Sequence, residues 1–361
     1  MKRFGAVAAL WIVFAGTPGV TAAATCPIGV PVVNLPHGPH PSGFNWSAPI
    51  LPAGDPCVAG ITVDPTNEKI WYVSGPKGLY ITRDGGVHWE HPNLAGAAMG
   101  QTVVLAPGNP AEVYAGTGKT LFGSANKGVT WKLLRTFERE IYSVLAAPGG
   151  RIYVGPAWGD SPTPNGIFFS PDKGAHWQAL PFGAGVKGLI CWDVERDPND
   201  GTLYVATEIA DHTKPGHPPL FRSQNGGQTW TNVAGTLPTH VIALELRPAD
   251  GYIYALTEGA GLYGSANHGA AWIPPTLIAG PTGSLLMNRK SPLKLYGGQQ
   301  KHQQLNGGAF VSVNAGKVFH PIGLAGATIG GFSLSGTGTR LYAAAYGSGV
   351  YVSPVPASLQ P

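Results

Sequence analysis

The sequence predicts an all-β protein, a seven-bladed β-propeller of four-stranded antiparallel blades whose ring is closed by an N-terminal strand. Three observations predict it. An eight-residue box recurs along the chain, strand patterns recur with the box, and no segment shows the sustained apolar period of a long helix. The 53 glycines and 34 prolines among 361 residues, with only 12% charged residues, agree with many short strands joined by turns.

The start of the chain has the pattern of a secretory signal peptide. Lys2 and Arg3 are followed by an apolar run and then by three alanines at 22–24, which fit the small-residue cleavage rule. The run is shorter than the roughly 20 residues that span a membrane. We expect a soluble secreted or periplasmic protein with no membrane span after cleavage; an uncleaved anchor is the alternative. The expected segments are a signal peptide at 1–24, an N-terminal extension at 25–43 and the propeller at 44–358.

Charge and cysteine content narrow the function classes. The formal charge of +4 includes Lys2 and Arg3, so cleavage leaves +2, and no basic run exists to favour nucleic acid. Three cysteines allow one disulfide in an oxidising compartment, and we expect Cys26 to pair with Cys57, leaving Cys191. We expect no metal, because the histidines lack the tight spacing of metal ligands. We also expect a monomer without a cofactor.

The repeated box has the pattern Ser/Thr-x-Asp/Asn-x-Gly-x-x-Trp/Phe. It first occurs as TRDGGVHW at 82–89, recurs four times in good form, and ends in the worn copy SVNAGKVF at 312–319. Its closing aromatic residues are 42 to 53 residues apart, the length of one supersecondary unit. The defining residues are Asp84 with Trp89, Asn126 with Trp131, Asp172 with Trp177, Asn225 with Trp230, and Asn267 with Trp272.

We interpret the box as a turn between the third and fourth strands of a blade. Asp or Asn tolerates the left-handed conformation and caps local amides, glycine supplies positive φ, and Ser/Thr bonds within the loop. The Trp ring offers an apolar face to the neighbouring repeat. Asn replaces Asp in three of the five good copies, which a general acid or base would not allow. The box is therefore predicted to be structural.

Each unit carries three strands before its box and one after it, as expected of a four-stranded blade. Seven copies of the second strand give seven blades, but the last copy, RLYAAAYGSGVYV, ends before any box. Near the start of the chain, Trp46 aligns with the box Trp. We therefore expect residues near 44–48 to supply the outer strand of blade seven, because closure removes exposed sheet edges.

These boxes and their flanking strands resemble the Asp-box (BNR) repeat of β-propellers, over nearly the whole chain after the signal. The repeat style is similar to that of xyloglucanases and of photosystem II assembly factors. Such a resemblance implies the fold rather than one activity. Xyloglucanases of this type oppose their catalytic acids across two propellers, and this chain has one; the assembly factors bind partner proteins. The Arg-Ile-Pro motif of sialidases is absent, the nearest string being Arg151-Ile152-Tyr153.

We expect a ligand on the face opposite the boxes. Loops between second and third strands are long at 155–166, 207–219 and 298–308, and long loops on a rigid scaffold tend to carry function. A Trp beside carboxylates suits stacking on a sugar ring, whereas the alternative is solvated loops with Trp158 packed locally. The candidate ligand-binding residues are Trp158, Asp160, Asp211, His212, His217 and His302, and the second loop also carries Glu208.

The leading interpretation is a binding module or scaffold that recognises a glycan or another exported protein through this face. The alternative is a glycoside hydrolase, xyloglucanase-like or sialidase-like, that uses a pair of acids among Asp160, Asp193 and Asp211. A separation near 5 Å would favour retention and about 6.5–9.5 Å inversion. Asp193 lies in a predicted inner strand, where it can equally bind an arginine or water.

Overall fold

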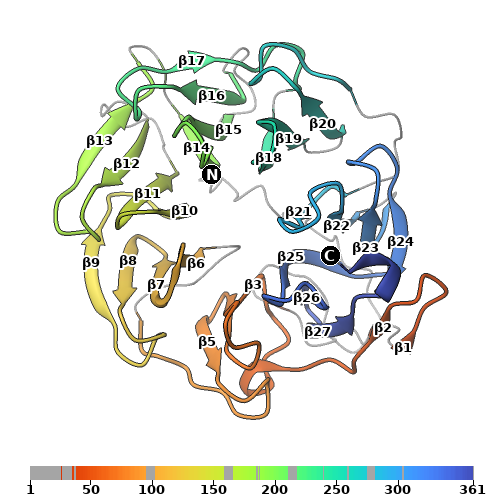
Figure 1. Cartoon of the computed structure of the whole chain (residues 1–361). Helices are drawn as coiled ribbons and strands as arrows, with labels where there is room; N and C mark the ends of the chain where they lie inside the picture. Colours follow the sequence, from red (N-terminus) through yellow and green to blue (C-terminus); the bar gives the residue numbers. More distant parts are fainter. Residues whose placement is uncertain are drawn as a thin grey trace, which may run out of the picture.

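The protein forms a ring of seven blades in the computed structural model (Figure 1). Each blade is an antiparallel sheet, and its first strand lies nearest the centre of the ring. This arrangement confirms the predicted all-β, seven-bladed propeller. The structure describes residues 26, 35, 38–94, 102–157, 166–183, 186, 188–209, 218–238, 240–257, 260–274, 281–302 and 305–360, without the side chains of 209, 300–302 and 305.

The first four blades follow one another along the chain. Blade 1 consists of β3 (Gly60–Val63), β4 (Trp71–Gly75) and β5 (Gly78–Thr82). Blade 2 consists of β6 (Val103–Ala106), β7 (Asn109–Thr117), β8 (Thr120–Ser124) and β9 (Lys132–Thr136). Blade 3 consists of β10 (Ile141–Ala147), β11 (Arg151–Pro156), β12 (Gly166–Ser170) and β13 (Gln178–Pro181). Blade 4 consists of β14 (Leu189–Arg196), β15 (Leu203–Ile209), β16 (Leu220–Ser223) and β17 (Thr231–Asn232).

The remaining blades continue the same order. Blade 5 consists of β18 (Val241–Arg247), β19 (Tyr252–Thr257) and β20 (Gly261–Ser265). Blade 6 consists of β21 (Ser284–Met287), β22 (Leu295–His302), β23 (Leu305–Ser312) and β24 (His320–Gly323). Blade 7 consists of β25 (Thr328–Leu334), β26 (Arg340–Tyr346) and β27 (Gly349–Pro354). Outside the blades lie the pair β1 (Gly38–Pro39) and β2 (Asn45–Trp46) and the short 3₁₀ turns η1 (Pro52–Gly54) and η2 (Ala357–Leu359).

In the three-stranded blades the fourth position is reduced to a single bridge. Ile81 pairs with Glu90 in blade 1, and Gly264 pairs with Ile273 in blade 5. In blade 7 the partner of Val350 is Ile50, some 300 residues earlier in the chain. The prediction of four strands per blade thus holds fully for blades 2, 3, 4 and 6.

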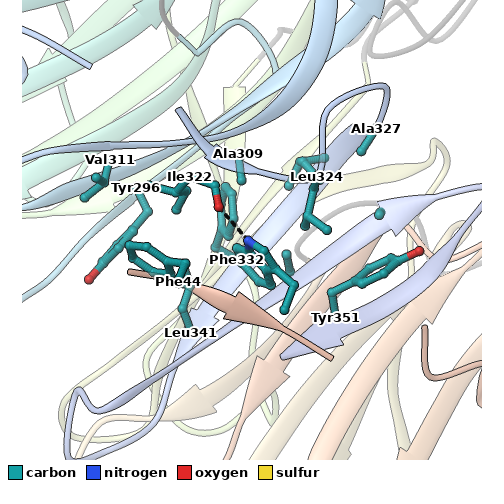
Figure 2. Close-up of a cluster of buried hydrophobic side chains, with 14 of the residues drawn as sticks. Phe44, Tyr296, Ala309, Val311, Ile322, Leu324, Ala327, Phe332, Leu341 and Tyr351 are labelled. Carbon is teal, nitrogen blue, oxygen red and sulfur yellow. Dashed lines mark hydrogen bonds between the residues drawn. The ribbon is translucent and has the colours of Figure 1, made fainter. Parts of the chain in front are cut away.

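The N-terminal segment completes blade 7, as the alignment of Trp46 predicts. The Ser47 amide donates to the Val352 carbonyl at 2.8 Å, and the amides and carbonyls of Ile50 and Val350 are bonded to each other. The Trp46 indole N–H donates to the Ile322 carbonyl of blade 6 at 2.6 Å, inside a buried cluster (Figure 2). In blade 5 the indole of Trp272 likewise donates to the Val233 carbonyl, directly after the outer strand of the preceding blade. Trp46 therefore makes the same kind of interblade bond as Trp272, whereas Trp89 and Trp177 donate within their own boxes.

The box forms the same turn in its six copies. The Ser/Thr hydroxyl accepts the amide of the box glycine, as Ser124 does from Gly128 at 2.8 Å. The Asp/Asn side chain accepts an amide four residues later, as Asp172 does from His176 at 2.8 Å. The corresponding bonds in the other copies start from Thr82 and Asp84, Asn126, Ser170, Ser223 and Asn225, Ser265 and Asn267, and Ser312 and Asn314.

One detail of the expected turn is wrong. The left-handed residue is not the Asp or Asn but the residue that follows it, with φ between 57° and 79° at Gly85, Lys127, Lys173, Gly226, His268 and Ala315. Asp and Asn keep negative φ because their carboxylate or amide must reach forward to the later N–H. The left-handed residue turns its side chain to the preceding blade: Lys127 Nζ lies 2.7 Å from Asp64, and Lys173 Nζ lies 2.7 Å from Glu112.

Apolar side chains fill the contact between each pair of neighbouring blades. The seven main buried clusters each combine side chains of two adjacent blades, and the box aromatic, or Trp46 in blade 7, packs into each one. Blades 6 and 7 share the largest of them, which contains Phe44, Trp46 and Tyr296 (Figure 2). Burying these faces supplies the main favourable term for the ring, since apolar burial contributes about 25 cal/mol per Å².

The N-terminal region is also covalently tied to blade 1. A disulfide joins Cys26 and Cys57, the pair expected from the sequence, with Cα atoms 5.6 Å apart, and Cys191 is a buried free thiol. Within the described part of the chain, no helix is long and apolar enough to cross a membrane.

We predict that Trp46→Ala lowers the free energy of unfolding by about 3–5 kcal/mol, because it empties a buried site and removes a hydrogen bond between blades 6 and 7. The measurement is urea unfolding followed by circular dichroism. Trp89→Ala is the matched control, since Trp89 has the same role in blade 1 but is only partly buried and donates within its own box. Equal losses for the two variants would contradict a special role of Trp46 in ring closure.

Candidate functional site

Most of the loop residues predicted to bind a ligand lie outside the described residues. These are Trp158, Asp160, Asp211, His212 and His217. The first two belong to the loop after β11 and the other three to the loop after β15. Their roles therefore stay predictions, and so does any acid pair that includes Asp160 or Asp211.

The third predicted loop is largely not a loop. Residues 298–308 extend β22 and β23 into a long hairpin, in which Gln299 pairs with Gly308, Lys301 with Asn306, and His302 with Leu305. The strands were not predicted here because the stretch is rich in glycine and glutamine and lacks the alternating apolar residues of a strand. His302 is the last residue of β22 and pairs with Leu305, so it belongs to the hairpin and not to a loop.

The inner strands of several blades carry a bulge at the same place near the loop face. The pairing register shifts at Tyr142 in β10, Trp192 in β14, Ile242 in β18 and Gly330 in β25. A bulge leaves one residue outside the ladder and re-aims its side chain. In blade 7 only glycine fits, since a Cβ on Gly330 would lie 2.2 Å from the Ala59 carbonyl oxygen. Blades 3 and 4 instead place aromatic rings there.

These two rings form part of a group that we call the loop-face cluster, consisting of Tyr142, Trp192, Glu208 and His240. The rings of Tyr142 and Trp192 meet edge to face with centroids 5.0 Å apart. The Trp192 indole N–H donates to the buried Glu208 carboxylate at 2.6 Å, and His240 Nδ1 lies 3.7 Å from the other carboxylate oxygen. Three blades thus contribute to one cluster, and Glu208 fixes the orientation of the indole.

Part of the loop-face cluster remains open to solvent. Tyr142 and Trp192 are partly exposed, and 22% of the His240 side chain is accessible. Burial raises the pKa of the Tyr142 hydroxyl, with Glu140 and Glu208 adding to the rise, so this hydroxyl stays protonated and can donate a hydrogen bond. An aromatic surface bordered by a hydroxyl and an imidazole can hold a planar or ring-shaped polar molecule.

The first long loop begins beside this cluster. Ala157, directly after β11, forms a bridge with Ile190 in β14 of the next blade. Its amide also donates to the Glu140 carbonyl at 2.8 Å. Ala157 is thus fixed to Ile190, which lies two residues before Trp192 in β14. The start of the loop and the cluster therefore share one part of the loop face.

Asp193, the candidate acid in an inner strand, has a structural partner. Its Oδ2 accepts the Leu244 amide of blade 5 at 2.8 Å, which links two neighbouring inner strands. Side chains on other inner strands make the same kind of link. The further bonds of this kind are Glu245 to the Met287 amide, Ser284 to the Ile329 carbonyl, Ser333 to the Val63 amide, and Thr62 to the Val103 carbonyl.

Asp193 also belongs to a group of charges around the ring centre, together with Glu195, Glu245 and Arg289. Arg289 Nη2 lies 3.8 Å from Glu195. Burial, together with the neighbouring charge of Glu195, raises the pKa of Asp193 to about 7. Burial likewise raises the pKa of Glu245 to about 8, against the opposing effect of Arg289. One arginine thus stands against three carboxylates, which favours protonated acids near neutral pH.

This charge group does not combine into a metal site. Among the residues that the structure describes, no set of three or more His, Cys, Asp or Glu side chains is arranged to hold a metal ion. What the group can do is hold protons, because a carboxyl with a pKa near 7 can donate or accept one at neutral pH.

Tyr142, Trp192 and His240 are not among the site residues predicted from the sequence. The signal was present in the repeat, because aligning the inner strands places Tyr142 of EIYSVL opposite Trp192 of ICWDVE. A bulge was not foreseen there, so both residues read as ordinary members of an apolar strand. His240 carries no pattern of its own, and only the fold brings it to Glu208.

Comparisons with known proteins agree with the propeller fold. No family model matches the chain. Xyloglucanase Xgh74A of Acetivibrio thermocellus is 25% identical over 243 residues, which cover 60% of this chain and 24% of that protein. The chain therefore matches about a quarter of the length of that curated relative.

Solved structures agree. The GH74 xyloglucanase of Xanthomonas campestris has a TM-score of 0.66 at 18% identity, covering 88% of this chain and 55% of that chain. YCF48 bound to D1 peptide has a TM-score of 0.61 at 14% identity, covering 89% of this chain and 99% of that chain. At these identities the likeness shows the fold alone, a propeller of the xyloglucanase and YCF48 type.

The raised pKa of Glu245 predicts a stability profile. Between the usual carboxyl pKa of 4.5 and about 8, the unfolded chain loses a proton that the folded chain keeps. Stability should therefore be fully present below pH 4.5 and decline as pH rises to 8, by up to about 1.4 kcal/mol per pH unit for this group. Glu245→Gln keeps an oxygen for the Met287 amide but removes the ionisation, so its profile should be flatter.

The check is urea unfolding of both proteins at pH 5, 6, 7 and 8. Glu138→Gln, which removes an exposed carboxylate, is the control and should run parallel to the wild type. A Glu245→Gln profile that also runs parallel would show that this carboxyl does not hold its proton in the folded protein.

Proposed function

We propose that this chain is an exported glycan-binding propeller whose ligand rests on the loop-face cluster. The carrying observation is the Trp192 ring, partly exposed at the loop face and fixed by its bond to the buried Glu208 carboxylate. A pre-oriented aromatic ring loses little conformational freedom on binding. The apolar face of a sugar ring can pack on such a surface.

The neighbouring groups suit the same ligand. The protonated Tyr142 hydroxyl and the partly exposed His240 ring can hydrogen-bond sugar hydroxyls at the edge of the Trp192 surface. The loop at 155–166, for which the sequence predicts ligand-binding residues, begins beside the cluster at Ala157. The disulfide between Cys26 and Cys57 supports export, because such bonds persist in oxidising compartments.

Glycan recognition is favoured over xyloglucan hydrolysis because of what the described candidate acid contacts. The matched region covers about a quarter of the length of the relative named a xyloglucanase. Asp193, the described candidate acid, is engaged in the bond between blades 4 and 5. The similarity to a xyloglucanase supports a carbohydrate ligand for this chain.

A glycoside hydrolase is the second candidate, and one observation favours it. Burial raises the pKa of Asp193 to about 7, which suits a general acid at neutral pH. Its partner acid would come from Glu208 or from the predicted Asp160 and Asp211 of the same face.

The binding proposal predicts measurable affinity for a neutral oligosaccharide in calorimetry with xyloglucan, cellulose, xylan and mannan oligomers. Trp192→Ala should weaken binding about ten-fold or more, and Trp192→Phe should weaken it less because it keeps a ring. Trp89→Ala, which alters a tryptophan on the box face, is the matched control and should bind as the wild type does. Binding that survives Trp192→Ala would overturn the assigned site, and selective binding of an extended peptide would replace the glycan.

The hydrolase alternative predicts reducing-sugar release from the same oligomers, and we expect none. Release that disappears in both Asp193→Asn and Glu208→Gln would establish hydrolysis by these acids. Asn at 193 retains the acceptor for the Leu244 amide, so a lost activity would report the lost proton rather than a broken blade contact. Thermal melting of each variant checks that the ring is intact.

A further inference from the structure

A groove lies on the box face, between blades 3 and 4 and away from the loop-face cluster. Its volume is about 410 Å³. Blade 3 contributes the start of β11, the end of β12 and the start of β13, and blade 4 contributes the end of β14, the following turn and its box. We call it the box-face groove. The residues used below are Arg151, Tyr153, Phe169, Gln178, Arg196 and Asp200.

Two stacked aromatic rings line one side of the groove. Tyr153 and Phe169 lie nearly parallel, with centroids 4.8 Å apart. Tyr153 is buried and Phe169 is partly exposed, so the pair presents a firm apolar surface rather than a free ring. Such a surface can take the carbon face of a sugar ring.

Two arginines line the same groove. Arg151 is exposed and donates to the Pro148 carbonyl at 2.9 Å, while Arg196 is partly buried, and both charges reach the Tyr153 hydroxyl. Gly201 leaves room for Arg196: a Cβ at this position would lie 2.7 Å from its Nη2. Among the described residues neither guanidinium forms an ion pair. Both therefore keep donors for an incoming anion.

The rest of the lining is polar but nearly neutral. Gln178, Gln224 and Gln228 place amide groups around the rim, and Asp200 adds one negative charge. The Asp200 carboxylate accepts the Thr202 amide at 2.8 Å, within its own turn. Two cations against one anion give too little net charge for a polyanion such as nucleic acid. Amides beside an aromatic surface suit hydroxyl groups, and guanidinium groups suit a carboxylate.

We propose that the box-face groove binds a carboxylate-bearing sugar, the hexuronate unit of an acidic polysaccharide. The carboxylate would lie between Arg151 and Arg196, the ring face on the Tyr153–Phe169 pair, and the hydroxyls against the glutamine amides. The proposal is independent of the loop-face cluster, because it uses other residues, the opposite face and a charged ligand.

The test is calorimetry of the full chain with oligogalacturonate and with the matched neutral oligogalactoside. The wild type should bind the uronate, and this binding should weaken at high salt. In Trp192→Ala, which lacks the ring of the loop-face cluster, the uronate should still bind and the neutral sugar should not bind at the same concentrations. Arg151→Gln combined with Arg196→Gln should weaken uronate binding about ten-fold or more, because charge-assisted bonds are lost.

Arg340→Gln is the matched control, since Arg340 opens the second strand of blade 7 as Arg151 opens that of blade 3, but it faces Glu68. It should bind as the wild type does. Gln178→Glu is a second test that leaves both arginines in place and should weaken uronate binding by adding a negative charge at the rim. Melting temperatures identify any variant with a damaged fold.

Three results would overturn the proposal: no uronate binding at millimolar concentration, unchanged binding by the double variant, or equal binding of a glutamate-rich peptide. Trp192→Ala separates this groove from the proposed function, because it should leave uronate binding intact.

Discussion

Closure of the ring is the constraint on which the structure depends. Each blade offers apolar faces to two neighbours, so these faces are all buried only when the ring is closed. The chain meets this requirement at blade 7 by bringing residues 45–50 back to β27, and by seating Trp46 against the Ile322 carbonyl of blade 6 (Figures 1 and 2). Gly323 makes the seat possible, since a Cβ there would lie 2.8 Å from the Trp46 indole nitrogen. The disulfide at Cys57 holds the same N-terminal region to blade 1.

The two ends of each blade use polar chemistry differently. On the box face, Ser/Thr and Asp/Asn satisfy backbone amides within a turn, and side chains such as Lys127 bind the preceding blade. Around the ring centre, side chains such as Asp193 and Glu245 bind backbone groups of the following blade. Much of the charge in this sparsely charged chain therefore serves the contacts between blades. Side chains on the loop face that take no part in such contacts are the ones available to bind a ligand.

The two candidate sites differ because of this division. The loop-face cluster is aromatic, and its buried acid orients a ring that remains partly exposed. The box-face groove is cationic, and its arginines are left without acidic partners among the described residues. A neutral sugar suits the first site and a charged one the second. On the two proposals made above, the rigid ring would keep a neutral and an acidic sugar segment at a constant separation.

The sequence by itself determined the repeat, and with it the number of blades, their strand order and the closing role of Trp46. This was possible because each blade is a local unit of some 45 residues whose turns demand particular residue types. Three cysteines allow three pairings, and the pair expected from the sequence, Cys26 with Cys57, is the one that forms. The tertiary structure alone decided where side chains from different blades meet. Tyr142, Trp192, Glu208 and His240 come from three blades and share no spacing, and a one-residue bulge, invisible to periodicity, aims the two rings. Contacts between blades depend on the curvature of the closed ring, which no single repeat contains.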